Sequence, residues 1–327
     1  MGVYLFMTLA ERWFDGRSRL MARSRAPILV GPWRSELGFE TLYWLPWLAK
    51  WRERYQIAKE RLVIVTRGGA GVWYDAGKTA DLYHYTSEDV LRRQMFTDLK
   101  RQQSIKQLSM TEWDRRLLDL VAEDVGLLGH FRLHPSAMYR ALSPWWGGRW
   151  GVGDIMDRLA FQPLLAPSVP SAIPLPQSFL AVRFYARATW AMTPDSRAWV
   201  TKLIQRLAAK TPVVILSSPV RPDDHTDFQV SGEHILDLAP YVTPTNHLAI
   251  HSAVLSKAKA FVGTYGGTMQ LAVRLGKPAA GFYQQFNGTA FEHRVLTEWL
   301  AVRQQQPIFI GRPEDATFGH ELMRVLE

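Results

Sequence analysis

The sequence contains no cysteine, which excludes disulfides, thiolate metal sites and a cysteine nucleophile. It also lacks an apolar run of about 18 residues, the length that a membrane-spanning helix requires. Acidic residues are fewer than basic ones, 30 against 39, and the net charge of +9 predicts an anionic partner. Nucleotide diphosphates, phospholipid surfaces and nucleic acids are all anionic. No helix-turn-helix, zinc-finger or RNA-binding signature accompanies the charge, so we do not expect nucleic acid as a partner.

What is present is typical of a globular protein. Hydrophobic residues make up 47% of the 327 residues and charged residues 21%. In both halves, short apolar runs that suit buried strands alternate with amphipathic stretches that suit helices. Such alternation predicts an α/β fold with mainly parallel sheets.

Proline divides the chain into two parts. Five prolines between residues 161 and 178 forbid a helix and favour an extended connector. We therefore predict five segments: an amphipathic N-terminal segment (1–26), an N-terminal Rossmann-like domain (27–165), a Pro-rich linker (166–178), a C-terminal Rossmann-like domain (179–312) and a C-terminal helix (313–327) that can cross back to the first domain.

The N-terminal segment is predicted to be an amphipathic helix. Phe6, Leu9, Ala10 and Trp13 follow the spacing of one helix face, and five arginines lie between residues 12 and 25. A basic amphipathic helix can lie on an anionic membrane surface. The alternative is a helix packed on the protein's own surface.

The stretch 259–283 predicts a strand, a glycine-rich turn, a helix and a second strand. The turn and the start of its helix contain Gly263, Thr264, Tyr265, Gly266, Gly267 and Thr268. The first turn of a helix presents unpaired N–H groups with partial positive charge, and glycines allow close approach of an anion. These residues predict a phosphate-binding turn for a nucleotide-linked substrate. The alternative is an ordinary strand-to-helix turn.

Two acidic residues follow the first predicted strand. Glu36 lies in the loop where open α/β sheets place their ligands, and Glu40 is four residues on, on the same helix face. The pair could supply a general base and its electrostatic neighbour, or bind a sugar hydroxyl. The alternative for Glu36 is a charge that stabilises a helix N-terminus.

Other polar residues follow predicted strands or lie in loops. His134 could be a base or a phosphate ligand, or a structural histidine, and Arg67 could hold a carboxylate or phosphate. Arg183 and Tyr185 lie near the end of the first strand of the second half, as donor-binding candidates. The further candidates for the cleft are Arg34, Arg67, Asp75, Asp224, His225 and Arg294. The acidic loop that holds Asp224 is interpreted as a solvated turn, and no metal site is predicted.

Taken together, several motifs resemble a bacterial glycosyltransferase family with the GT-B fold. They are GPWRSELGFETLYWLPWL, VTRGGAGVWYD, RLHPSAMY, FLAVRFY, RPDDHTDF and FVGTYGGTMQLAVRLGKPAAGFY, and they span most of residues 27–283. The resemblance implies two Rossmann-like domains that face each other across a cleft. It implies a nucleotide-sugar donor held mainly by the C-terminal domain, at residues 263–267 and Arg183, with Glu36 facing the sugar. The E-x7-E motif of the common retaining subfamily does not occur, so retention or inversion stays open.

The expected activity is metal-independent transfer of a sugar from a nucleotide-sugar to a glycan or lipid-linked acceptor in bacterial surface polysaccharide synthesis. No cofactor is expected, because the nucleotide-sugar is a substrate. The expected location is the cytoplasm, or the inner membrane face through residues 1–25. The alternatives are a nucleotide-sugar epimerase of similar fold and a non-catalytic nucleotide-sugar-binding protein.

Overall fold

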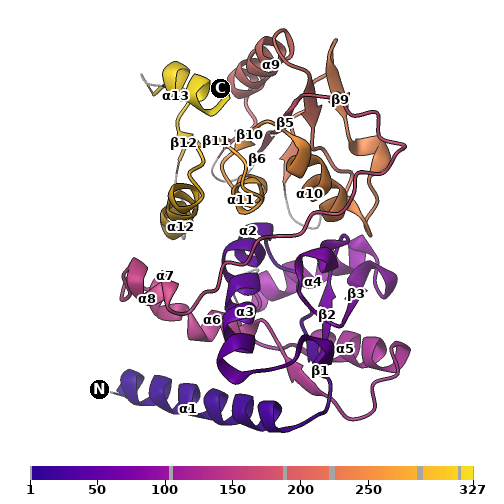
Figure 1. Ribbon diagram of the computed structural model, residues 1–327, viewed down its shortest axis with the longest axis vertical. Coiled ribbons are helices and arrows are strands. Elements are labelled where there is room, and N and C mark those ends of the chain that lie inside the picture. Colours follow the sequence, from indigo (N-terminus) through magenta and orange to yellow (C-terminus); the bar gives the residue numbers. More distant parts are fainter. Residues whose placement is uncertain are drawn as a thin grey trace. The chain divides into compact units, whose positions relative to one another are not determined.

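The computed structural model describes residues 2–102, 106–186, 190–220, 225–285, 290–315 and 318–326 (Figure 1). By its internal contacts the chain forms two compact units. Unit 1 contains Met1–Ser35 and Tyr43–Gln162, and unit 2 contains Glu36–Leu42 and Pro163–Glu327. Each unit is built around its own parallel sheet, which confirms the predicted α/β class.

Unit 1 has a four-stranded parallel sheet in the order β3-β2-β1-β4. The strands are β1 (Ile28–Val30), β2 (Leu62–Thr66), β3 (Lys78–Asp81) and β4 (Phe131–Leu133). Both β1 and β2 are buried along their whole length, because strands in the middle of a covered parallel sheet have no solvent-facing side. In the strand order β3-β2-β1-β4, the topological switch point lies between β1 and β4.

The described part of unit 1 also contains α-helices. They are α1 (Gly2–Arg23), α3 (Leu45–Tyr55), α4 (Glu88–Gln102), α5 (Glu112–Asp124), α6 (Ser136–Ala141), α7 (Ser143–Trp146) and α8 (Val152–Met156). Of these, α4 and α5 pack on the sheet. A capping box starts α5, where Thr111 accepts from the Asp114 N–H and Asp114 accepts from the Thr111 N–H. The buried face of α5 packs Leu117, Leu118 and Val121 against Leu29 of the sheet.

Helix α1 packs on α3 within unit 1. Trp51 Nε1 donates to Ser18 Oγ at 3.0 Å, and Tyr55 Oη donates to Asp15 Oδ1 at 2.6 Å. The outward face keeps Trp13 and Leu20 about 60% exposed and also carries exposed Arg12. Packing on the protein's own surface, one of the two predicted alternatives, is therefore observed, and a basic, apolar face stays open.

Unit 2 has a six-stranded parallel sheet in the order β12-β11-β10-β5-β7-β9. The strands are β5 (Leu180–Arg183), β7 (Val213–Ile215), β9 (Ile235–Asp237), β10 (Phe261–Thr264), β11 (Ala279–Phe282) and β12 (Ile308–Gly311). In chain order this is 6-5-4-1-2-3, the order of the doubly wound Rossmann sheet. The sheet switches between β5 and β10.

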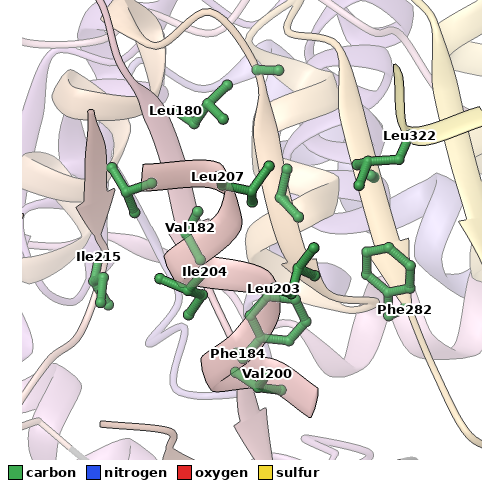
Figure 2. Close-up of a cluster of buried hydrophobic side chains, with 14 of the residues drawn as sticks. Leu180, Val182, Phe184, Val200, Leu203, Ile204, Leu207, Ile215, Phe282 and Leu322 are labelled. Atoms are coloured by element: carbon green, nitrogen blue, oxygen red, sulfur yellow. The ribbon is translucent and has the colours of Figure 1, made fainter. Parts of the chain in front are cut away.

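The core of unit 2 lies between the sheet and α9 (Pro194–Ala208), as Figure 2 shows. Helix α9 presents Val200, Ile204 and Leu207 to this core at helical spacing. The strands present Val182 and Ile215. The other helices of the unit are α2 (Leu37–Phe39), α10 (His247–Lys257), α11 (Gly267–Arg274), α12 (Ala290–Arg303) and α13 (Phe318–Leu326), and a short ribbon pairs β6 (Tyr185–Ala186) with β8 (Thr226–Asp227).

A few local expectations need correction. The tryptophan- and glycine-rich stretch 143–153 suits a loop by composition; residues 147–151 are irregular, but α7 and the start of α8 flank them. The helix that begins at Leu37 contains a π-helical turn, η1 (Glu40–Trp44), before α3. Its first residues, Glu36–Leu42, pack with unit 2 although the rest of the helix belongs to unit 1.

Candidate functional site

The candidate site lies at the switch point of unit 2, where β5 and β10 are neighbours. The strands are parallel, with Val262 paired to Val182, so both carboxyl ends lie at the same edge of the sheet. Doubly wound sheets bind ligands at this edge, in the crevice between the strands where the order reverses. Arg183 ends β5, Tyr185 begins the short strand β6, and Thr264 ends β10.

Helix α11 begins at Gly267, directly after β10 and the turn Tyr265-Gly266. Gly266, at the N-cap, has no side chain that could cap the helix. Thr264 is fully buried, and its hydroxyl accepts from the Tyr185 N–H at 3.0 Å, which ties the turn to the chain after β5. The N-terminal end of α11 therefore lies at the switch point with its positive dipole end toward it.

Arg183 is held beside α11. Its Nε donates to Asp227 Oδ1 at 3.1 Å, its Nη1 donates to Thr268 Oγ1 at 3.3 Å, and its guanidinium lies 5.4 Å from the centre of the Tyr185 ring. The Arg183 side chain keeps 14% of its surface exposed. The predicted donor-binding residues of β5 and β10 are thus brought together, and the bond to Thr268 aims Arg183 at the first turn of α11.

Protein groups occupy the space that the glycines leave. A side chain at Gly263 would overlap the Arg183 carbonyl at 2.1 Å, and one at Gly266 would overlap the Tyr185 hydroxyl at 2.0 Å. A side chain at Gly267 would come within 2.9 Å of Gly38 N. These glycines thus allow the strand, Tyr185 and α2 to approach the turn. The Tyr265 N–H already donates to the Phe282 carbonyl at 2.8 Å. The groups that could meet an anion are therefore the N–H groups from Gly266 into the first turn of α11 and the Thr268 hydroxyl.

The N-terminal end of α2 lies against the N-terminal end of α11. The Cβ and Cγ atoms of Leu37 lie within 3.2 Å of the position that a Gly267 Cβ would take, and Gly38 contacts the Gln270 side chain. Glu36 is the N-cap of α2, with a half-buried side chain. Two positive helix ends converge here, an arrangement that an anion or carboxylate stabilises.

Glu40 follows on the next turn. Its N–H donates to the Glu36 carbonyl at 3.2 Å, and its side chain is completely buried. Phe39, between them, makes an edge-to-face contact with His293 at 4.6 Å. Glu36 is therefore the more accessible of the two predicted carboxylates.

The switch point of unit 1 is built differently. Arg34, which follows β1, has a side chain with 0% exposure, and it pairs with Asp98 at 2.6 Å and with Asp114 at 2.9 Å. His134, which follows β4, places Nε2 3.5 Å from Asp114 Oδ2, and its Nδ1 accepts from the Ser136 N–H at 3.1 Å. A buried ion-pair network therefore fills the place where a ligand would bind in a doubly wound sheet.

Burial and charge act in opposite directions in this network. Burial tends to raise the pKa of Asp114, but the hydrogen bond with His134 and the charge of Arg34 outweigh it and hold the pKa well below 3.8. Burial lowers the pKa of His134, and the bond to Asp114 only partly compensates. His134 is thus hydrogen-bonded through Nδ1, and its Nε2 lies 3.5 Å from Asp114 Oδ2.

The remaining candidate residues do not form one cluster. Arg67 is buried and donates to the Ser35 carbonyl at 2.5 Å, and Asp75 pairs on the surface with Lys59 at 3.0 Å and Arg52 at 3.1 Å. His225 stacks on Tyr185 at 4.4 Å, at the unit 2 switch point. Arg294 pairs with Glu298 on α12 at 2.7 Å. Asp224 lies outside the described residues.

Some contributors were not predicted. Asp227 is the carboxylate partner of Arg183, and Asp98 and Asp114 are the partners of Arg34. The antiparallel pairing of Tyr185 with Asp227 places the first of these partners. A signal did exist in the sequence, since Asp227 belongs to the loop that was interpreted as a solvated acidic turn.

In the described part of the chain, no helix is long and apolar enough to cross a membrane. Within the same residues, no group of three or more histidine, aspartate or glutamate side chains is arranged to hold a metal ion.

No family model and no curated protein matches this chain. Solved structures that resemble it include a glycosyl transferase of family 9 from Veillonella parvula (12% identity, 92% of this chain, 90% of that chain, TM-score 0.45). The E. coli ADP-heptose LPS heptosyltransferase II (14% identity, 92% and 98%, TM-score 0.47) and the E. coli heptosyltransferase WaaC with ADP (12% identity, 92% and 100%, TM-score 0.44) are also similar. Because these TM-scores are below 0.5, the function is inferred from the residues of the site.

Proposed function

We propose that the protein is a glycosyltransferase that binds a nucleotide-sugar at the switch point of unit 2 and transfers its sugar to a glycan or lipid-linked acceptor. One observation carries this proposal: the N-terminal end of α11, Arg183 and Glu36 all belong to the ligand-binding edge of a Rossmann-ordered sheet. In this position, N–H groups of α11 bind the diphosphate and Arg183 adds positive charge.

The same groups suit the departure of a nucleotide. When the glycosidic bond breaks, negative charge grows on the leaving diphosphate. Fixed N–H dipoles and a guanidinium therefore stabilise the transition state more than they stabilise the bound substrate. His225, stacked on Tyr185, adds a flat surface beside the same turn. The proposed reaction needs no metal ion, because the helix end and Arg183 take over charge neutralisation.

Glu36 is the proposed catalytic carboxylate. As the N-cap of α2, it lies at the helix that contacts Gly267, and it is half-buried. If the configuration is inverted, Glu36 takes the proton from the acceptor hydroxyl as that oxygen displaces the nucleotide. If it is retained, Glu36 displaces the nucleotide from the anomeric carbon, and the acceptor oxygen then displaces Glu36. A role in surface polysaccharide synthesis agrees with the exposed Arg12, Trp13 and Leu20 of α1, which suit a peripheral position on an anionic membrane.

The experiment has two steps. A thermal-shift screen with UDP, GDP, CMP and dTDP sugars identifies the donor, and nucleotide release is then followed with a membrane extract as the source of acceptor. Glu36→Gln should retain donor binding and lose about 100-fold or more in turnover. Glu53→Gln, at a 67%-exposed side chain of α3, is the matched control and should be unchanged. Full turnover in Glu36→Gln would remove Glu36 from the mechanism.

Incubation with the donor alone separates the alternatives. An epimerase would convert the donor into an isomeric nucleotide-sugar without an acceptor, and a binding protein would return it unchanged under every condition. The proposed transferase consumes donor at a rate that depends on acceptor.

A further inference from the structure

Unit 1 contains a polar pocket that borders its filled switch point at His134. The pocket has a volume of about 250 Å³ and lies where α1, α5, β4 and α6 meet. Its polar lining includes Arg17, Arg115, Arg132, Arg140, Ser109 and Ser136. A phosphoryl group and part of its substituent fit such a volume, since a water molecule in the liquid takes up about 30 Å³.

The charged residues that line this pocket are all basic. Among its described lining residues, four are arginines and none is a carboxylate. The carboxylate that pairs with Arg132, Asp119, is not one of the lining residues. Arg17 Nη2 donates to a neutral group, the Arg132 carbonyl, at 2.9 Å.

The arginines also disfavour one another. Burial lowers the pKa of Arg17, and the nearby charge of Arg140 lowers it further. Cations brought together without an anion cost free energy, and a bound anion would remove that cost. The chain keeps these side chains around one pocket, as expected of a site for a negatively charged ligand.

The rest of the lining is apolar or aromatic. Trp13, Phe14, Met21 and Met110 form part of the wall, and Trp13 is 60% exposed, so the pocket opens beside the outward face of α1. A ligand with an anionic group inside and a sugar or lipid portion at the rim would satisfy both halves of the lining.

We propose that this pocket binds a phosphoryl group, as a phosphomonoester or diphosphate, of a ligand distinct from the nucleotide-sugar. The identity of this ligand rests on the proposed function. For a glycosyltransferase, the ligand is the acceptor, and the enzyme uses a phosphorylated acceptor. Arg115 and Arg140 bind the phosphoryl oxygens from opposite elements, α5 and α6, and Arg17 contributes from α1.

The test is titration of the full chain with inorganic pyrophosphate, measured by calorimetry and by the shift in melting temperature. The donor that the thermal-shift screen identifies is present at a saturating concentration, so that the proposed diphosphate site of unit 2 is already occupied. The double variant Arg115→Gln/Arg140→Gln should bind about tenfold more weakly or worse. Arg116→Gln is the matched control, because Arg116 is adjacent to Arg115 on α5 and both residues are exposed, but Arg116 does not line the pocket. It should bind as the wild type does.

Melting without ligand separates binding from folding. Removing Arg140 relieves its repulsion of Arg17, so the ligand-free double variant should melt at the wild-type temperature or above it. Pyrophosphate affinity that is equal in the wild type and the double variant, or absent from both, would overturn the proposal.

Two further arms identify the source of the phosphoryl group. Glucose 1-phosphate represents a free sugar phosphate, and phosphatidylcholine vesicles with and without phosphatidic acid represent a lipid. Arginine-dependent binding in either arm supports the pocket and assigns its ligand. Nucleotide-sugar binding is measured on the same variants and should be unchanged, so failure of the donor site and failure of this pocket give different results.

Discussion

The two parallel sheets of this protein place an arginine at the same topological position and use it in opposite ways. Arg34 follows β1, and Arg183 ends β5, so each arginine lies at the carboxyl end of the strand where its sheet reverses. Arg34 has no exposed side-chain surface and two carboxylate partners, whereas Arg183 has one carboxylate partner and 14% exposure.

The difference shows that topology supplies a possible site and that local residues decide whether it is open. In unit 1, Asp98, Asp114 and His134 fill the switch point. In unit 2, a helix N-terminus without a capping side chain meets an arginine that also bonds Thr268. We therefore expect substitutions in unit 1 to change stability and substitutions in unit 2 to change ligand binding.

The largest expected effect is on stability in unit 1. Arg34→Met leaves Asp98 and Asp114 buried without their cation, so unfolding should become easier by about 3–5 kcal/mol. Denaturant unfolding of the variant measures this loss. Arg116→Met, which removes an exposed pair, is the control and should cost about 1 kcal/mol at most. Equal losses in the two variants would contradict the structural role of Arg34.

The corresponding change in unit 2 should appear in binding. Arg183→Gln removes a charged donor beside α11, and donor affinity measured by calorimetry should fall about 10- to 100-fold. Its effect on stability should be smaller than that of Arg34→Met, because Asp227 still accepts a hydrogen bond from the Ser218 N–H at 3.3 Å. Unchanged donor affinity would show that Arg183 serves the fold alone and would make the two arginines equivalent.

A third substitution tests how tightly the turn is packed. In Gly266→Ala, the new methyl group would overlap the Tyr185 hydroxyl, and the strain should cost about 1–2 kcal/mol in unfolding free energy. Tyr185→Phe removes the oxygen that is overlapped, so the double variant should recover much of the loss. Denaturant unfolding of the four proteins in a double-mutant cycle gives the coupling. Additive effects would mean that Tyr185 does not occupy the space beside Gly266.

The smallest expected effect is on pH dependence. Burial lowers the pKa of His251 in unit 2 well below 6.5, and the charge of Arg183 adds to this effect. The histidine binds a proton more readily in the unfolded chain than in the folded protein. His251 therefore does not affect the free energy of unfolding above about pH 6.5. Below that pH it lowers the free energy of unfolding by up to about 1.4 kcal/mol per pH unit.

His251→Gln should therefore flatten the decline in melting temperature between about pH 6.5 and 5. His134→Gln in unit 1 should flatten it less, because Asp114 partly offsets the lowering of the His134 pKa. The reverse order would contradict the assigned environments of the two histidines.

The sequence predicted the α/β class and most strands because buried parallel strands are short apolar runs, as in β2 and β10. It did not predict β3, whose residues Lys78–Asp81 are mostly polar because the strand lies at the sheet edge. The sequence did not predict the carboxylate partners of Arg34 either. Asp114 is 80 residues away in the chain, and no local pattern links the two.

The glycines of the α11 turn illustrate a different limit. Their spacing predicts that an anion approaches the backbone closely, and this stays a prediction, because the groups found beside the glycines belong to the protein. Tyr185 and α2 occupy the space beside Gly266 and Gly267. The roles predicted for Glu36, Arg183 and the turn stay predictions about chemistry, whereas their placement within unit 2 follows from packing.

Hydrogen–deuterium exchange of the full chain, with and without each nucleotide-sugar, shows where a donor binds. Binding at the switch point of unit 2 should slow exchange in residues 264–270 and 183–186 with one donor, while the segment around Arg34 and His134 is unaffected. Protection confined to unit 1, or no protection by any nucleotide-sugar, would contradict the proposed donor site.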